Sequence, residues 1–307
     1  MKVKTKLVFV ISIICISLIA IEVFLRQYYG FTDNILIRED PDYEYIAKAN
    51  QDRFRFRRHI SYNSKSMRSR EVDSSAQIIL GFGDSVINGG TLTDQDSLAT
   101  TILSDSLSDI QQKKIQFLNI SAGSWGPDNS YAYLEKHGDF GAESIFLFVS
   151  SHDAYDNMSF EKIVDVHKSY QSEQYSLALY ELLDRYLFPR AKDLIQKFKS
   201  NNNNYEINKK KEEIKFNTGF TSFIKYTEKK NILLTIYLHP EKKELIKGSY
   251  NKQGYEIIKL ASNHNVPLIK GLDDKFERAD YRDGIHLNSK GQKKLASKVL
   301  KYMDTIT

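Results

Sequence analysis

The sequence predicts an α/β protein with three layers, α/β/α, around a mostly parallel sheet of five strands, preceded by one transmembrane helix. The first observation is that short apolar runs alternate with helical segments after residue 72, which is typical of parallel strands joined by crossover helices. The second is one long apolar stretch near the N-terminus, with about the 20 residues that cross a bilayer. The 307 residues, 41% of them hydrophobic, can fill the core of one large domain.

The N-terminus predicts a membrane anchor. Residues 1–6 carry three lysines, and residues 7–25 form the apolar stretch, which contains Glu22 near its far end. Because basic flanks stay in the cytoplasm, we expect a cytoplasmic tail and a catalytic region on the periplasmic or extracellular side. A cleavable signal peptide is the alternative, but the stretch is long for one and Leu18 is not the small residue wanted two positions before Ala20. We favour an uncleaved signal anchor, which makes the lipid bilayer a partner.

Residues 26–73 are expected to form a juxtamembrane segment that is polar, aromatic and basic. Arginine and phenylalanine alternate over 52–58, which predicts a half-exposed edge strand that packs Phe54 and Phe56 on the main domain. The alternative is that its arginines meet anionic headgroups or an acidic glycan.

The main domain is expected over residues 74–307. Apolar runs of strand length lie at 78–82, 115–120, 144–149, 232–238 and 266–269, and helical segments at 97–107, 129–136, 216–229, 254–263 and 289–303. Residues 160–215 are too long for an ordinary crossover, so we expect a helical insertion that ends in a solvated tail with the asparagines of 201–204 and the lysines of 209–211. The tyrosines at 170, 175, 180 and 186 do not fit one helical stripe, and they either pack under the insertion or stack on sugars.

Charge and motifs exclude several classes of function. The net charge of +5 is small and mixed along the chain, so we expect no nucleic-acid partner. A dinucleotide fingerprint at Gly81 and Gly83 lacks its third glycine, because Val86 stands there. Histidine and aspartate pairs could be drawn as metal ligands, but they would leave a serine and a glycine at strand ends unexplained. We therefore expect no cofactor and no metal.

The residues that could perform chemistry follow the predicted strands. Ligands bind outside the carboxyl ends of the strands in open α/β sheets. At such ends lie Ser85, Gly123, His152 with Asp153, and Asp283 with His286.

These residue types suit nucleophilic catalysis. A serine hydroxyl needs a base to take its proton, and histidine is the usual base. His286 is our candidate base for Ser85, and Asp283 could hold its imidazole in the productive tautomer. His239 is the strongest rival, because it also ends a predicted strand.

Three segments resemble sequence blocks of the SGNH/GDSL hydrolase superfamily. They are the Gly-Asp-Ser triplet that ends at Ser85, the segment around Gly123, and the Asp283 to His286 segment, which resemble the first, second and fifth blocks. The resemblance implies an SGNH or flavodoxin-like fold and an attack by Ser85 on an ester carbonyl. It also implies that His286 acts as base and then acid, that Asp283 orients it, and that the amides of Ser85 and Gly123 bind the oxyanion.

The third block departs from the family pattern. Where the family has an asparagine whose amide completes the oxyanion hole, this chain has His152, which can donate from a ring nitrogen or merely pack beneath the insertion. Asn63 and Arg68 loosely resemble an upstream element of membrane-anchored bacterial members. Trp125 and Asp153 are placed to form walls of the substrate cleft, although a core position for Trp125 is the alternative.

The sequence therefore predicts an exported, membrane-anchored serine esterase that acts through an acyl-enzyme. Its location favours an O-acetylated cell-surface or extracellular polysaccharide as substrate, and envelope polysaccharide machinery as a partner. Two alternatives remain. An O-acyltransferase would pass the acetyl group to a sugar hydroxyl, and a non-catalytic glycan-binding or assembly protein would retain only the fold.

Overall fold

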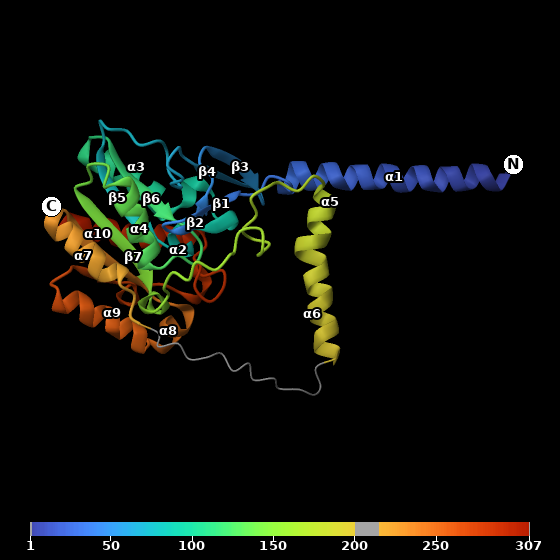
Figure 1. The fold of residues 1–307 in the computed structure, drawn as a ribbon. Coiled ribbons are helices and arrows are strands. Elements are labelled where there is room, and N and C mark those ends of the chain that lie inside the picture. The colour runs from blue at the N-terminus through green and yellow to red at the C-terminus, as the bar shows by residue number, and fades with distance from the viewer. Residues whose placement is uncertain (1, 200–214, 307) are drawn as a thin grey trace.

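A five-stranded parallel sheet lies at the centre of the main domain (Figure 1). The computed structural model describes residues 2–199 and 215–306. The strand order is β6-β5-β7-β8-β9, and all four pairings are parallel. The strands are β5 Gln77–Gly83, β6 Ile115–Ser121, β7 Ser144–Ser150, β8 Leu233–His239 and β9 Leu268–Lys270. The predicted α/β class and all five predicted strands are confirmed within a few residues.

Helices cover both faces of this sheet, which confirms the three-layer prediction. The helices of the main domain are α2 Ser85–Asn88, α3 Ala99–Gln111, α4 Pro127–His137, α7 Gly219–Lys230, α8 Lys242–Lys247, α9 Lys252–Asn263 and α10 Ser289–Ile306. Short 3-10 helices lie at Gly90–Leu92, Gln95–Ser97, Ser151–Ala154, Gly271–Asp273 and Arg278–Asp280.

Alternation along the strands explains the two cores. Ile78, Leu80 and Phe82 of β5 point into one hydrophobic cluster, which α4, α7 and α9 complete. The intervening Ile79 points into the other cluster, against α3 and α10. Strands that are buried on both faces read as continuous apolar runs, which is why they could be found in the sequence.

The order of the strands creates a switch point at β5. The chain leaves β5 for β6 on one side and then returns to β7 on the other side, so β5 pairs with both. The loops after β5, β6 and β7 therefore lead to different sides of the sheet. In α/β sheets, ligands bind in the crevice between such loops, at the carboxyl ends of the strands. This topology positions the candidate site.

The juxtamembrane segment folds as two hairpins and not as an edge strand of the main sheet. Strands β1 Ile37–Asp40 and β2 Glu44–Ala47 pair antiparallel, as do β3 Gln51–Arg55 and β4 Arg58–Tyr62. The prediction of one strand over 52–58 was wrong because two consecutive residues, Phe56 and Arg57, adopt positive φ angles of 49° and 62° and reverse the chain. Phe56 packs against Phe31 and Tyr186, outside the main core.

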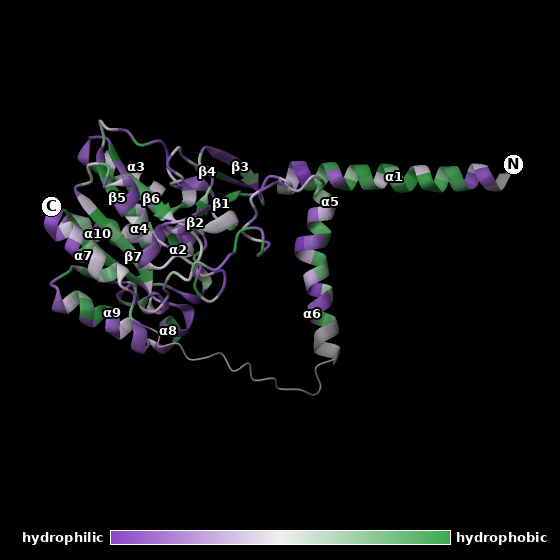
Figure 2. Ribbon diagram, viewed as in Figure 1, coloured by the Kyte–Doolittle hydropathy of each residue, from purple (hydrophilic) through white to green (hydrophobic). Residues whose placement is uncertain are grey.

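The N-terminal helix α1 Lys2–Tyr29 extends away from the main domain (Figure 1). Its segment Lys4–Tyr29 is long and apolar enough to cross a membrane, and the most apolar part of that segment is not buried. Most of this helix is coloured as hydrophobic in Figure 2. The length and hydropathy of α1 agree with the predicted apolar N-terminal helix. A cleavable signal sequence would have the same length and hydropathy, so these two properties do not determine the topology.

Among the described residues of the insertion, the helical part runs from Ala178 to Lys199. Residues 160–177 are largely irregular, and they are followed by α5 Ala178–Glu181, one wider turn Leu182–Leu187 and α6 Phe188–Lys199. The predicted tail with 201–204 and 209–211 lies outside the described residues. A buried ion pair of 2.5 Å joins Arg55 of β3 to Glu181 of α5, so the juxtamembrane hairpins and the insertion pack together.

Candidate active site

Ser85 lies at the junction between the central strand and a single helical turn. Strand β5 ends at Gly83, and Asp84 caps α2 by accepting a hydrogen bond of 2.8 Å from the backbone N–H of Val86. A Cβ at Gly83 would lie 2.8 Å from the carbonyl oxygen of Phe148, so only glycine permits the close passage of β7. This turn presents the side chain of Ser85 at the carboxyl edge of the sheet.

A chain of hydrogen bonds connects Ser85 to an imidazole and a carboxylate. His286 Nε2 lies 2.9 Å from Ser85 Oγ, and His286 Nδ1 lies 2.7 Å from Asp283 Oδ2. These distances are within hydrogen-bonding range for a nucleophile, its base and the group that orients the base. The three side chains are therefore arranged as in a serine-hydrolase triad.

Asp283 is held as a carboxylate. Partial burial opposes the charge, but hydrogen bonds from the backbone N–H groups of Ile285 and His286 and from the imidazole outweigh burial and lower the pKa of Asp283 to about 2. The same carboxylate thus fixes the loop and the Nδ1–H tautomer of His286. It is ionised at every pH at which an esterase would be assayed.

The rival base, His239, does not reach Ser85. It is buried at the end of β8, and its Nε2 lies 2.9 Å from the carbonyl oxygen of Ile285. Burial lowers the pKa of His239 to about 4, so the ring is neutral and donates this hydrogen bond. His239 therefore stabilises the loop that carries His286 through a hydrogen bond to its backbone at Ile285.

Gly123 follows β6 and lies beside Ser85 in one cavity of about 240 Å³. No described residue accepts a hydrogen bond from the backbone N–H of Ser85 or of Gly123. Both donors are thus available to a bound oxyanion. A Cβ at Gly123 would lie 2.9 Å from the hydroxyl oxygen of Tyr170, so a side chain of the insertion lies directly over this glycine.

The walls of this cavity come from the juxtamembrane segment and the insertion, for which contact with a glycan was only an alternative in the sequence analysis. Tyr45 and Tyr62 belong to the juxtamembrane hairpins, and Tyr170 and Arg185 belong to the insertion. Their part in the cavity was missed, because contacts between segments more than 100 residues apart leave no local pattern in a single sequence. The feature of the sequence that could have indicated these walls was the number of tyrosines in the juxtamembrane segment and in the insertion.

Asn88 lines the cavity, and Arg68 contacts the backbone of Asn88 from outside it. Asn88 Nδ2 donates to the carbonyl oxygen and the hydroxyl of Ser121, at 3.0 and 3.1 Å, and so joins α2 to the end of β6. Arg68 is fully buried and donates to the carbonyl oxygens of Asn88, Gly90 and Thr93. Arg68 therefore organises the loop after α2.

The second residue of the upstream element, Asn63, has a local role. Its side-chain oxygen accepts hydrogen bonds from the backbone N–H groups of Lys65 and Met67, at 2.9 and 3.0 Å. It shapes the turn that leads the chain to Arg68.

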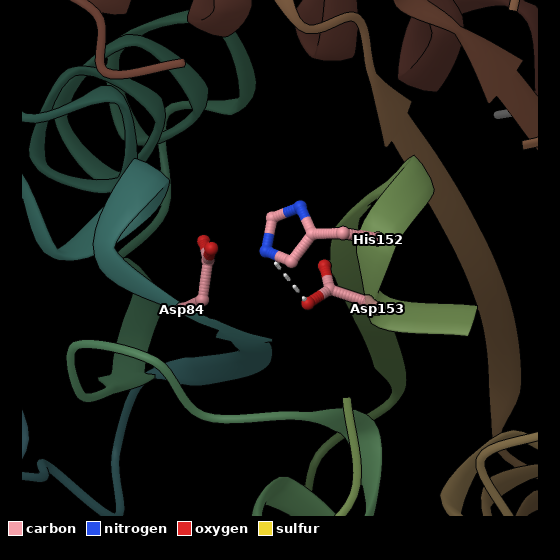
Figure 3. Close-up of side chains that lie close together, drawn as sticks. All are labelled: Asp84, His152 and Asp153. Atoms are coloured by element: carbon pink, nitrogen blue, oxygen red, sulfur yellow. Dashed lines mark ion pairs between the residues drawn. The ribbon is translucent and has the colours of Figure 1, made fainter. Parts of the chain in front are cut away.

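His152 lies between carboxylates (Figure 3). Its Nε2 is 3.5 Å from Asp153 Oδ1, its Nδ1 is 3.3 Å from Glu241 Oε1, and potential ligand atoms of Asp84, His152 and Asp153 lie within 4.8 Å of one another. Both ring nitrogens thus face acceptors. Because Asp153 Oδ1 makes no hydrogen bond with a described residue, the Nε2–H of His152 is not taken up by this contact, and the assignment of His152 as an oxyanion donor stays a prediction.

The charges in this cluster compensate one another, because a protonated His152 lies among carboxylates. Burial would lower the pKa of His152, but its hydrogen bond to Glu241 and the charges of Asp153 and Asp84 outweigh burial and raise the pKa to about 9. Burial raises the pKa of Asp84, and burial together with the charge of Asp84 raises that of Asp153. With a protonated imidazole the three residues form an ion cluster, and a metal ion could bind there only if His152 lost this proton.

Two residues expected in the cleft lie elsewhere. Trp125 is 1% exposed, and its Nε1–H donates a hydrogen bond of 2.9 Å to the carbonyl oxygen of Tyr45. It packs on Tyr43 and Tyr133, so the prediction of a cleft wall is corrected to a core position. Asp153 is also buried, where it accepts a hydrogen bond from the backbone N–H of Ser150, and does not line the cavity.

No family model and no curated protein matches this chain. Among solved structures, three quarters of it aligns with a two-domain esterase (CEX) active on acetylated mannans, with 13% identity and a TM-score of 0.45. This chain covers half of that esterase. It also aligns over 75% of its length with all of TesA (13% identity, TM-score 0.46) and with 96% of a Clostridium thermocellum family 3 carbohydrate esterase (19%, 0.41).

Proposed function

We propose that this chain is a serine ester hydrolase with Ser85 as nucleophile, His286 as general base and acid, and Asp283 as the residue that orients the imidazole. The observation that carries the proposal is the 2.9 Å contact between His286 Nε2 and Ser85 Oγ, backed by a carboxylate at Nδ1. A protein that kept the fold only to bind glycans would have no need for this alignment.

The reaction follows from these positions. Ser85 Oγ attacks the ester carbonyl while His286 Nε2 takes its proton, and the resulting oxyanion accepts hydrogen bonds from the N–H groups of Ser85 and Gly123. Collapse of the intermediate breaks the ester bond, and His286 returns the proton to the departing alcohol. Water, deprotonated by the same imidazole, then attacks the acyl-enzyme. His286 Nε2 passes this proton to Ser85 Oγ as the acyl–Oγ bond breaks, which releases the carboxylic acid and restores the serine.

We infer that the acyl group is short and that the substrate is an O-acetylated glycan outside the cytoplasm. The cavity at Ser85, about 240 Å³, is below the usual range for drug-sized ligands, which supports an acetyl group more than a fatty acyl chain. An apolar helix preceded by lysines supports a signal anchor over residues 7–25 and an exported domain over 74–307. O-acetylated envelope glycans would offer short acyl esters on that side of the membrane.

Hydrolysis of p-nitrophenyl esters by the full chain in detergent micelles tests the proposal. We expect turnover of the acetate, a steep loss of activity with the octanoate, and loss of both turnover and fluorophosphonate labelling in Ser85→Ala. Ser75→Ala, which removes an exposed serine far from the cavity, is the matched control. Labelling that persists in Ser85→Ala would refute the nucleophile.

The same assay separates hydrolysis from acyl transfer. An added oligosaccharide acceptor should leave the rate of p-nitrophenol release unchanged if water resolves the acyl-enzyme. Release that depends on the acceptor, with acetylated sugar as product, would instead make this protein an O-acyltransferase. Absence of any serine-dependent turnover of short esters would favour the glycan-binding alternative.

A further inference from the structure

The helical part of the insertion carries apolar side chains that the domain does not cover. Leu183, Leu187 and Leu194 are 39%, 44% and 58% exposed. Leu187 and Leu194 are seven residues apart and thus lie on one face of the helix, whereas Lys192 projects from the opposite face. This part of the chain is an amphipathic helix with an unpartnered apolar face.

This helix is fastened to the end of α1. The carboxylate of Glu22 accepts hydrogen bonds of 2.8 Å from the backbone N–H groups of Ala178 and Leu179, which open α5. Arg26, one turn further along α1, donates a hydrogen bond of 2.6 Å to the carbonyl oxygen of Ser176. An acidic side chain of α1 thus caps the first turn of α5, which explains why an acid interrupts the apolar stretch.

The orientation of the helix relative to α1 matches a membrane surface. In Figure 1, α5 and α6 run crosswise to α1 from the point at which α1 reaches the main domain. Phe24, Tyr28 and Tyr29 cluster at this same end of α1, and Arg57 of the β3–β4 turn donates to the Tyr28 hydroxyl. Aromatic and basic side chains are the residues that gather at bilayer interfaces.

Charge also favours lipid as the occupant of the apolar face. Arg190 and Lys192 of α6 are exposed, as are Arg57 and Arg58 beside the end of α1. Basic groups around an apolar helical face attract anionic headgroups while the apolar side chains enter the acyl boundary. A surface for another protein copy would not require the face to lie across the end of a membrane-length helix.

We propose that α5, the turn after it and α6 form an interfacial helix that lies on the bilayer crossed by α1, with Leu183, Leu187 and Leu194 directed into the lipid. This inference rests on the membrane anchoring proposed above. The main domain is then held against the membrane at two points, the end of α1 and the length of α6.

Fluorescence quenching in the full chain, reconstituted in nanodiscs that contain anionic phospholipid, tests this arrangement. Cys15 is the only cysteine of the chain and is replaced by serine, so that single cysteines can carry a bimane label. The labelled variants are Leu187→Cys and Leu194→Cys on the apolar face, with Lys192→Cys on the opposite face as the matched control. Leu18→Cys reports on α1.

We expect lipid-borne spin labels to quench the probes at 187, 194 and 18, and aqueous iodide to quench the probe at 192. Iodide quenching at 187 and 194, with lipid quenching at 18, would overturn the inference while leaving the anchor intact. Protection from both quenchers at 187 and 194 would place this face against protein, and would also overturn it. Failure of lipid quenching at 18 would overturn the anchor and this inference together, whereas p-nitrophenyl acetate turnover reports on the triad independently.

Discussion

The hydroxyl of Tyr45 donates a hydrogen bond of 2.7 Å to the carbonyl oxygen of Gly123. A residue of the juxtamembrane segment thereby fixes the peptide that follows β6, next to the candidate oxyanion donor. The segment between the apolar helix and the main domain is therefore part of the site and not a spacer.

Removing this hydrogen bond should weaken catalysis without unfolding the domain. Tyr45→Phe loses one neutral hydrogen bond of about 1 kcal/mol, so we expect a roughly fivefold fall in kcat/KM for p-nitrophenyl acetate. Tyr43→Phe is the control, because the Tyr43 hydroxyl contacts Arg38 and His137 away from the cavity. Equal activity losses in both variants would argue against a specific role for the Gly123 contact.

Gly123 should not tolerate a side chain while Tyr170 keeps its hydroxyl. In Gly123→Ala the new Cβ would lie 2.9 Å from the Tyr170 hydroxyl oxygen, closer than real Cβ contacts normally come, so the loop or the tyrosine must move. We expect kcat/KM to fall by about tenfold, or ~1.4 kcal/mol. The double variant with Tyr170→Phe should recover part of this loss, and strictly additive losses in the double-mutant cycle would contradict the contact.

The His152 cluster should make stability depend on alkaline pH. The folded-state pKa of His152 is raised to about 9, so its stabilising contribution is complete below its unfolded-state pKa of about 6.5 and is lost as pH rises through 9. We expect the melting temperature of the wild type to fall more steeply between pH 6.5 and 10 than that of His152→Asn.

The variant should also be the less stable protein at neutral pH, since Asp84, Asp153 and Glu241 then lack their shared cation. His264→Asn, at an exposed position after α9, provides the control. Parallel melting curves of the wild type and His152→Asn across this pH range would rule out a charged imidazole in the cluster.

The buried pair between Arg55 and Glu181 should matter far more than a surface pair. Their side chains are 1% and 0% exposed, so Glu181→Gln leaves an uncompensated buried charge, and we expect a loss of about 3–5 kcal/mol in unfolding free energy. Asp105→Asn breaks the exposed pair with Arg70 and should cost at most about 1 kcal/mol. Urea unfolding of the detergent-solubilised chain, followed by circular dichroism, compares the two. Similar losses would contradict the burial argument.

The sheet could be predicted because its strands are buried on both faces and leave continuous apolar runs, as in 78–82. Ser85, Asp283 and His286 could be proposed because Ser85 directly follows a strand, and Asp283 and His286 lie in a short motif just before a helix. The hairpin turn at Phe56 and Arg57 could not, because neither residue is a typical turn former and the alternation continues through it. Trp125 was misplaced because its burial depends on Tyr43, which is far away in the sequence.

The connection between the membrane-length helix and the main domain is short and is held by side-chain contacts. Helix α1 ends at Tyr29, strand β1 begins at Ile37, and Glu22 and Arg26 tie the last turns of the helix to the insertion. A long flexible linker would let an enzyme sample the whole depth of the envelope. If α1 spans the membrane as proposed, these contacts would hold Ser85 at one distance from the lipid, and the proposed enzyme would act on esters presented at that distance.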